Sequence, residues 1–157
     1  MKPKVYIETT IPSYLAARPT RDLIVAAHQE ITRQWWLERR DRLEVFISRL
    51  VTDEAGSGDR QAAKERLRLL RGLAELDVTD EAISLAELLI ARSVVPPRAA
   101  ADAAHVAVAA VHAMDFLMTW NCAHLANAMI AGQMRQVCEA AGYPCPVICT
   151  PEELCEE

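Results

Sequence analysis

The run from residue 98 to residue 112 constrains the fold of this chain more than any other segment. Between its ends it contains only alanine and valine, apart from Asp102 and His105, and Pro96-Pro97 stands just before it. Proline suits the start of a helix, because its ring fixes φ and its missing N–H is not needed in the first turn. A helix that is apolar on almost every side belongs in an interior, packed between a sheet and other helices. The run therefore predicts an internal helix within a layered fold.

Short apolar runs alternate with helical stretches along the rest of the chain. The runs cover residues 5–7, 43–47, 76–78, 116–119 and 146–149, and the helical stretches include 80–92, 98–113 and 127–141. Strands that alternate with helices of this length form a parallel sheet with right-handed crossovers and helices on both faces. The sequence predicts a single three-layer α/β/α domain over residues 1–157, with a central parallel sheet of about five strands.

Hydropathy and cysteine usage predict a cytoplasmic protein without a membrane partner. No segment approaches the roughly 18–20 apolar residues of a membrane span, and no charged segment followed by an apolar leader opens the chain. None of the five cysteines forms a Cys-x-x-Cys pair, so we expect reduced thiols rather than a zinc site. Most of them crowd the C-terminal end, at Cys138, Cys145, Cys149 and Cys155.

Polar residues stand where a parallel sheet would place a ligand site, beyond the carboxyl ends of its strands. Glu8 follows the first predicted strand, Glu54 lies on the first helical turns after the second, and Asn121 follows the fourth. Asp102 lies in the first turn of the internal helix, where the helix dipole favours an anion but burial demands a partner. Each acid also has a structural interpretation: Glu8 could cap the next helix, and Glu54 could be solvated like its neighbour Asp53.

Carboxylates that converge on one crevice need a counter-charge, because like charges at short range repel and raise one another's pKa. Mg²⁺ or Mn²⁺ meets this need, since both prefer oxygen ligands and retain several waters. An ion held in this way can activate water against a phosphodiester and stabilise the leaving oxygen. The chain has no Gly-rich phosphate loop and no Gly-x-Ser-x-Gly elbow, so other common chemistries have less support.

The segments that carry these acids resemble the PIN-domain family, the nucleases that include the toxin half of VapC-type toxin–antitoxin pairs. The matching pieces are residues 5–15, Ile47-Ser48 followed by Glu54, and the segment from Asp102 to Asn121. Together they span nearly the whole chain in the family's order and spacing. The resemblance implies a PIN-like fold with an acidic pocket that binds Mg²⁺ or Mn²⁺ and cuts RNA.

The resemblance also assigns roles to individual residues. Glu8 takes the place of the usual first-strand aspartate, Glu54 that of the second acid and Asp102 that of the third. Thr119 falls on the hydroxyl that usually follows the fourth strand, and Asn121 falls where a fourth acid often lies. Glu8 is one methylene longer than aspartate and Asn121 lacks a charge, so we expect weakened affinity for the metal.

Three further residues are candidates for supporting the ligands or contacting the substrate. Thr9 directly follows Glu8, and His105 lies three residues after Asp102 on the same face of its helix. His124 lies in the loop after the fourth strand. For His105 a core position is the competing interpretation, and for His124 it is a role in shaping the loop.

The leading hypothesis is a metal-dependent endoribonuclease, the toxin of a toxin–antitoxin pair, with a small antitoxin protein as partner. Glu8, Glu54 and Asp102 would hold the ion, and Asn121 would orient water or a ligand. The alternative is a catalytically silent PIN-like interaction module whose acidic crevice binds a basic partner peptide. A third, weaker reading is a phosphatase or DNA nuclease, because the choice of RNA as substrate rests on the resemblance alone.

Two surface features leave alternatives open. The segment from residue 59 to 71 carries Arg60, Lys64, Arg66 and Arg68 in a chain of net charge −5. It is either a solvated helix face or a strip that tracks an RNA backbone. The adjacent pair Trp35-Trp36 indicates either a homodimer surface or an extra core contact, because neighbouring side chains on a helix point in different directions.

Overall fold

A five-stranded parallel sheet forms the centre of the molecule, which is described over residues 1–154 in a computed structural model. Its strands are β1 (Lys4–Ile7), β2 (Glu44–Ser48), β3 (Ala74–Leu76), β4 (Phe116–Met118) and β5 (Val147–Cys149). The strand order is β3-β2-β1-β4-β5, and every neighbouring pair is parallel. The chain therefore builds outward from β1 in one direction and then in the other, so the order reverses between β1 and β4.

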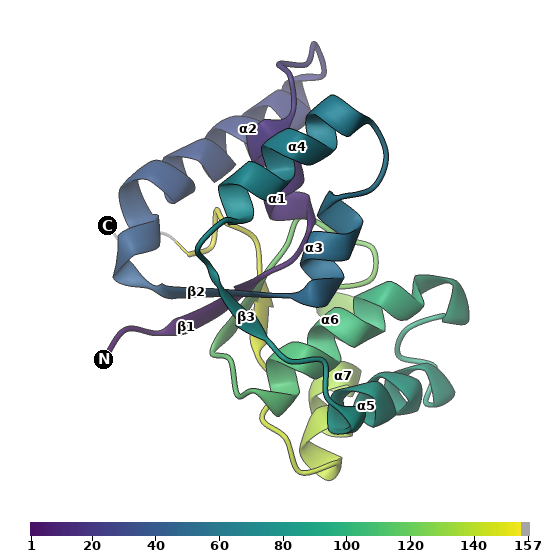
Figure 1. The fold of residues 1–157 in the computed structure, drawn as a ribbon. Coiled ribbons are helices and arrows are strands. Elements are labelled where there is room, and N and C mark those ends of the chain that lie inside the picture. The colour runs from purple at the N-terminus through teal and green to yellow at the C-terminus, as the bar shows by residue number, and fades with distance from the viewer. Residues whose placement is uncertain (155–157) are drawn as a thin grey trace.

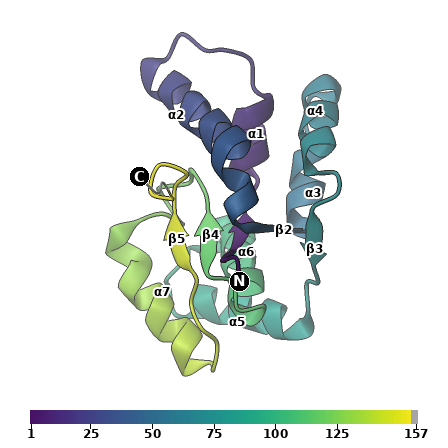
Figure 2. The same cartoon turned by 90° about the vertical axis from the view of Figure 1, so that its left-hand side faces the viewer.

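Helices connect the strands and cover the sheet on both sides. They are α1 (Thr10–Ala16), α2 (Leu23–Gln34), α3 (Arg49–Ala55), α4 (Arg60–Leu70), α5 (Asp80–Ala91), α6 (Ala100–Val111) and α7 (Ala128–Ala140). Figure 1 shows α1, α2 and α4 above the sheet and α5, α6 and α7 below it, and Figure 2 shows the same separation from the side. The predicted three-layer α/β/α arrangement with five parallel strands is confirmed.

The internal helix predicted from the alanine- and valine-rich run is α6. A short 3₁₀ turn at Pro97–Ala99 leads into it, as expected for a proline-initiated start. Its buried residues are Ala103 and the continuous stretch from His105 to Ala110. Because these side chains are small, α5 and the sheet can approach α6 closely, and α6 becomes the centre of the lower layer.

The boundaries of β3 differ from the prediction by two residues, more than those of the other strands. We expected residues 76–78, whereas β3 covers Ala74–Leu76 and pairs in register with the end of β2, so that Leu76 lies opposite Ser48. The carbonyl of Asp77 instead accepts a hydrogen bond from His112 Nε2 at 2.7 Å. The hydrophobic pattern at Leu76 and Val78 favoured the later register, but pairing with β2 sets the earlier one.

The tryptophan pair does not support the homodimer interpretation. Trp35 is 1% exposed, and Trp36 is partly buried against the core. A π-helical turn over Trp35–Arg39 brings the two ring centroids within 6.3 Å, so the rings do not point to opposite sides. The guanidinium of Arg40 lies 4.3 Å from the centroid of the Trp36 ring and covers it. Both tryptophans therefore act as core contacts.

The chain has no helix between residues 1 and 154 that is long and apolar enough to cross a bilayer.

Candidate functional site

The reversal of strand order brings the ends of β1 and β4 together. Glu8 is the first residue after β1, and its backbone N–H donates to the carbonyl of Met118, the last residue of β4, at 3.0 Å. Thr119 follows Met118 directly and is fully buried. The predicted meeting of the residues after the first and fourth strands is confirmed, and it occurs where open parallel sheets usually bind their ligands.

The carboxylate of Glu8 is held by hydroxyl and backbone donors. Its Oε1 accepts hydrogen bonds from the Thr119 hydroxyl at 2.7 Å, the Thr10 hydroxyl at 2.5 Å and the Thr10 backbone N–H at 3.0 Å. The residue is only 5% exposed. These three donors compensate for the cost of burying the charge. Within residues 1–154, the second oxygen of Glu8, Oε2, has no hydrogen-bond partner.

Glu54 lies beside this cluster, near the end of α3. Its Oε1 accepts a hydrogen bond from the Thr9 hydroxyl at 3.0 Å and another from His105 Nε2. Because Thr9 and Thr10 are consecutive, neighbouring hydroxyls bind the two carboxylates, Thr9 that of Glu54 and Thr10 that of Glu8. The Glu54 side chain is 41% exposed, whereas that of His105 is fully buried. The acid therefore lies at the boundary between core and solvent.

The contacts of Glu54 favour its ionised form. Burial raises the pKa of this carboxyl group, but three effects outweigh it. They are the hydrogen bond from His105, the attraction of the His105 charge when the imidazole is protonated, and the hydrogen bond from Thr9. The pKa of Glu54 therefore lies below its ordinary value of 4.5. Glu54 is an anion near neutral pH and could serve as a ligand for a cation.

Behind Glu54, buried polar side chains continue the hydrogen-bond network into the core. His105 Nδ1 lies 2.7 Å from the Tyr6 hydroxyl, which lies 2.7 Å from Ser48 Oγ. Ser48 also caps α3 by accepting the N–H of Leu50 at 3.2 Å. Burial, more than any other cause, raises the pKa of Tyr6 well above its usual range, so its hydroxyl keeps its proton.

Asp102 does not occupy the buried position that the sequence suggested. It lies in the first turn of α6 as predicted, but its side chain is only partly buried. Within residues 1–154 it makes no hydrogen bond or ion pair. The argument that burial forces Asp102 to take a cationic partner is therefore wrong, because water can solvate its carboxylate. A role as metal ligand stays a prediction.

Asn121 and His124 lie in the loop after β4, where the sequence predicted them. The side-chain oxygen of Asn121 accepts the backbone N–H groups of Ala123 and His124, at 3.2 and 3.1 Å. Its own N–H donates to the Thr119 hydroxyl at 2.9 Å. Asn121 thus stabilises a turn next to the Glu8 cluster, and the oxygen that was predicted to orient water or a ligand already accepts two hydrogen bonds.

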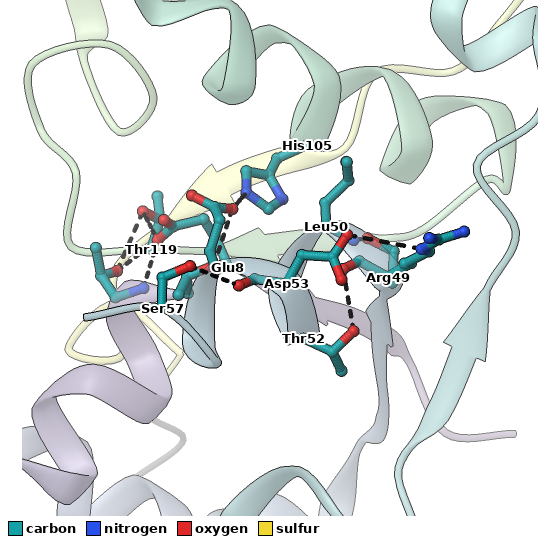
Figure 3. Close-up of polar contacts among 12 residues, drawn as sticks. Glu8, Arg49, Leu50, Thr52, Asp53, Ser57, His105 and Thr119 are labelled. Atoms are coloured by element: carbon teal, nitrogen blue, oxygen red, sulfur yellow. Dashed lines mark hydrogen bonds and ion pairs between the residues drawn. The ribbon is translucent and has the colours of Figure 1, made fainter. Parts of the chain in front are cut away.

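Two charged side chains near this site, Asp53 on α3 and Arg66 on α4, bond to partners other than Glu8 and Glu54. In Figure 3, Glu8, Thr119 and His105 lie on one side of the view, and Asp53 reaches the other way, toward Arg49. Asp53 pairs with Arg49 at 3.6 Å, and both side chains are largely exposed. Arg66, one of the predicted RNA-tracking residues, donates instead to the carbonyls of Ala55 and Ser57 at 2.9 and 2.6 Å.

The carboxylate oxygens of this site are suitable ligands for a hydrated Mg²⁺ or Mn²⁺. Glu8 and Glu54 each have one carboxylate oxygen that accepts no hydrogen bond from the described residues, and hard cations select such ligands. Within residues 1–154, however, no three His, Cys, Asp or Glu side chains gather closely enough to hold an ion. The donors thus fit an ion that one or two carboxylates hold and that water and phosphate oxygens surround, a common arrangement for Mg²⁺.

Sequence reasoning missed Tyr6, Ser48 and Thr10, which hold the acids in place. Tyr6 and Ser48 lie within strands and read as ordinary strand residues. Thr10 falls in the first turn of α1, where a hydroxyl is expected to serve its own helix rather than a carboxylate. The sequence signal that could have found Thr10 is the Thr9-Thr10 pair immediately after Glu8, because both hydroxyls stand next to an acid.

Comparison with known proteins supports the fold. No protein-family description and no curated protein matches this chain. A solved structure of VapBC2 from Rickettsia felis, bound to a DNA fragment from their promoter, contains a chain of similar fold, with a TM-score of 0.54. The two chains are 13% identical, and the match covers 93% of this chain and 97% of that one. At such low identity the match shows the fold alone, an α/β arrangement that the two chains share over nearly their whole length.

Proposed function

We propose that this protein is a metal-dependent endoribonuclease that hydrolyses RNA phosphodiester bonds. The observation that carries the proposal is the position of Glu8 and Glu54, bound by consecutive threonines where the strand order reverses. Each acid has one oxygen held by hydroxyl donors and a second oxygen without a partner among the described residues. Such carboxylates are suited to binding a divalent cation beside a phosphodiester.

Each residue of the site has a proposed task. Glu8 and Glu54 would hold Mg²⁺ or Mn²⁺ together with water and phosphate oxygens, and Asp102, the third predicted ligand, would reach the ion from the first turn of α6 through one of those waters. Thr119 keeps Glu8 in place, and Asn121 stabilises the turn that borders the site. When bound, the ion would supply an activated water and neutralise charge on the leaving oxygen. RNA as the substrate rests on the resemblance to PIN domains.

We further propose that the protein is the toxin of a toxin–antitoxin pair and has a small antitoxin protein as partner. Support comes from the VapBC2 structure, in which a chain of similar fold belongs to a named two-component assembly. The acidic residues of the site would attract basic side chains of such a partner.

The silent interaction module is a second candidate, because two observations favour it. Among the described residues, no three side chains form a cluster that could hold a metal ion. In addition, the carboxylate of Glu54 already pairs with His105. On this hypothesis a basic peptide would bind the carboxylates directly, and no ion would be needed. The two proposals therefore differ in whether the carboxylates bind a metal ion.

End mapping of cellular RNA tests the nuclease proposal. Total RNA is incubated with wild-type protein, Glu54→Gln or Asp102→Asn, with Mg²⁺ or Mn²⁺ and with chelator, and new 5′ ends are sequenced. We expect new ends with wild type and metal, and their loss in both variants. Asp53→Asn is the matched control, because Asp53 neighbours Glu54 in the chain but pairs outward with Arg49.

The outcome separates the two candidates. Cleavage by wild type and by Asp53→Asn alone would establish the nuclease and locate its cutting sites. The absence of new ends with every protein would instead support the silent module, particularly if Mn²⁺ binds wild type and Glu54→Gln equally weakly. Equal cleavage by all variants would point to a contaminating nuclease and would contradict the proposed site.

A further inference from the structure

A continuous line of hydrogen bonds connects the start of α3 to Glu54 through three buried side chains. It begins at the N–H of Leu50, passes through Ser48 Oγ and the Tyr6 hydroxyl, and reaches His105 Nδ1, with links of 3.2, 2.7 and 2.7 Å. His105 Nε2 then contacts Glu54 Oε1. Ser48, Tyr6 and His105 are all fully buried. We call these three residues the relay.

The donors and acceptors of the relay fit together in one direction. Ser48 Oγ accepts the N–H of Leu50, so its own hydroxyl hydrogen needs an acceptor inside the protein. Within residues 1–154 that acceptor is the Tyr6 oxygen. Tyr6 must then donate its hydrogen to His105 Nδ1. In the reverse direction the buried Ser48 hydroxyl would have no acceptor, which is costly.

This direction determines which nitrogen of His105 faces Glu54 as a donor. If Nδ1 accepts from Tyr6, the imidazole hydrogen lies on Nε2, which is the nitrogen that contacts Glu54 Oε1. The same oxygen also accepts the Thr9 hydroxyl at 3.0 Å. Two donors therefore hold Oε1 from the protein side. Within the described residues Oε2 has no partner, and the side chain is 41% exposed.

We propose that His105, oriented by Ser48 and Tyr6, is a positioning residue that anchors one oxygen of Glu54 and presents the other to the divalent cation. This inference rests on the proposed metal-dependent function. His105 cannot touch a substrate itself, because its side chain is fully buried. It acts through Glu54, as histidines and carboxylates behind metal ligands commonly orient the ligand in front of them.

The first test needs neither metal nor activity. Nitrogen-15 NMR of the histidine side chains at about pH 8 reports which imidazole nitrogen of each residue carries hydrogen, and His105→Gln assigns the signal of His105. We expect a protonated Nε2 and an unprotonated Nδ1 that is shifted by its hydrogen bond from Tyr6. In Tyr6→Phe, which lacks only the hydroxyl, the Nδ1 signal should move toward that of a free acceptor. A proton on Nδ1 in wild type would overturn the relay.

The second test measures Mn²⁺ affinity from the electron paramagnetic resonance signal of the free ion. Removal of a side chain that orients a metal ligand typically weakens binding about 10- to 100-fold, and we expect this loss for His105→Leu. His105→Gln should recover part of the affinity, because its amide N–H can still donate to Glu54. A purely structural role would not produce this rescue. His105→Leu that binds Mn²⁺ like wild type would overturn the proposal.

Two further comparisons keep the test decisive. If His105→Leu fails to fold by circular dichroism, Tyr6→Phe takes its place, with a smaller loss of Mn²⁺ affinity expected and unchanged affinity contradicting the proposal. If wild type binds no Mn²⁺ and cuts no RNA, the proposed function fails, and with it the role toward a cation. The NMR measurement still decides the hydrogen-bond direction in that case, so the two failures can be told apart.

Discussion

At the scale of single residues, a hydrogen bond of 2.7 Å from the Thr119 hydroxyl to the Glu8 carboxylate joins the ends of two strands. Glu8 and Thr119 lie at the ends of adjacent strands, and the alternation of strands and helices was sufficient to bring them together. The same reasoning failed for Asp102, because the composition of a helix does not say which side of its first turn faces solvent. Asn121 was placed correctly, but its side chain serves the local turn.

The supporting contacts could not be read from the sequence. Whether a strand tyrosine contacts a helix histidine depends on how closely α6 packs against β1, and this distance follows from the small side chains of the whole helix. Tyr6 and His105 are separated by 99 positions in the chain, yet their side chains are 2.7 Å apart. The periodicity of apolar residues predicts which residues form helices and strands. It does not predict which side chains from distant elements contact one another.

The lowered pKa of Glu54 predicts a pH-dependent contribution to stability. Its folded-state pKa lies below the ordinary value of 4.5, so the ionised form is stabilised by folding. This contribution is fully present above the unfolded-state pKa and is lost as pH falls through the folded-state pKa. The difference in urea midpoint between wild type and Glu54→Gln should therefore not vary with pH in the region of about pH 6.5, and it should shrink below about pH 4.5.

Asp53→Asn provides the comparison for this titration. Its side chain is 68% exposed and, among residues 1–154, pairs with Arg49 at the surface, so the effect of the substitution on the urea midpoint should be small at every pH. A stability difference for Glu54→Gln that does not change between about pH 6.5 and about pH 3.5 would show that the contacts with His105 and Thr9 do not favour the anion.

At the scale of elements, α4 shows how a charge pattern can mislead. The basic residues of this helix suggested a strip for an RNA backbone. Two of them are partnered within the protein, since Arg68 pairs with Glu65 at 3.1 Å and Arg66 donates to carbonyls at the end of α3 and just beyond it. Arg66 thus fastens α4 to the helix that carries Glu54. The contact of this helix with an RNA backbone stays a prediction, because the ion pair of Arg68 is exposed and leaves that side chain accessible.

Replacing Arg66 should destabilise the fold. Arg66→Gln removes a guanidinium that bonds the carbonyls of Ala55 and Ser57 at 2.9 and 2.6 Å. Hydrogen bonds to a charged group contribute about 1.5–3 kcal/mol each in favourable cases, and partial exposure of the side chain reduces this value. We therefore expect a loss of about 1–2 kcal/mol in the free energy of unfolding, measured by urea denaturation.

Arg60→Gln is the matched control on the same helix. Arg60 is exposed at the start of α4, where a positive charge opposes the helix dipole, so its removal should change stability by less than about 0.5 kcal/mol. Equal stability of Arg66→Gln and Arg60→Gln would contradict the fastening role. A selective loss in Arg66→Gln would show that part of the basic character of α4 is structural.

At the scale of the whole molecule, the fold was the most predictable feature. Apolar runs and helix-period segments fixed the number and direction of the strands, because parallel neighbours need helical crossovers. What the sequence missed is local: the register of β3, and the π-helical turn that brings Trp35 and Trp36 against one another.

The cysteines provide a probe of how cooperatively this fold opens. Cys122 is exposed, whereas Cys138 and Cys149 are buried. Burial, followed by the nearby charge of Glu153, raises the pKa of Cys149 to about 12. The hydrogen bond with Cys145, followed by burial, raises that of Cys138. Both buried thiols should react slowly for two reasons: reagents cannot reach them, and they stay protonated although the thiolate is the form that reacts.

Alkylation should therefore occur in two stages. With iodoacetamide at about pH 7.5, we expect rapid labelling of Cys122 in the native protein, with Cys138 and Cys149 labelled only at the rate of global unfolding. Peptide mass mapping over time measures each site, and urea should accelerate the two buried sites in parallel. Cys155 lies outside the described residues and is followed without an expectation. If Cys149 reacted as fast as Cys122 in native buffer, the edge of the sheet at β5 would open independently of the core.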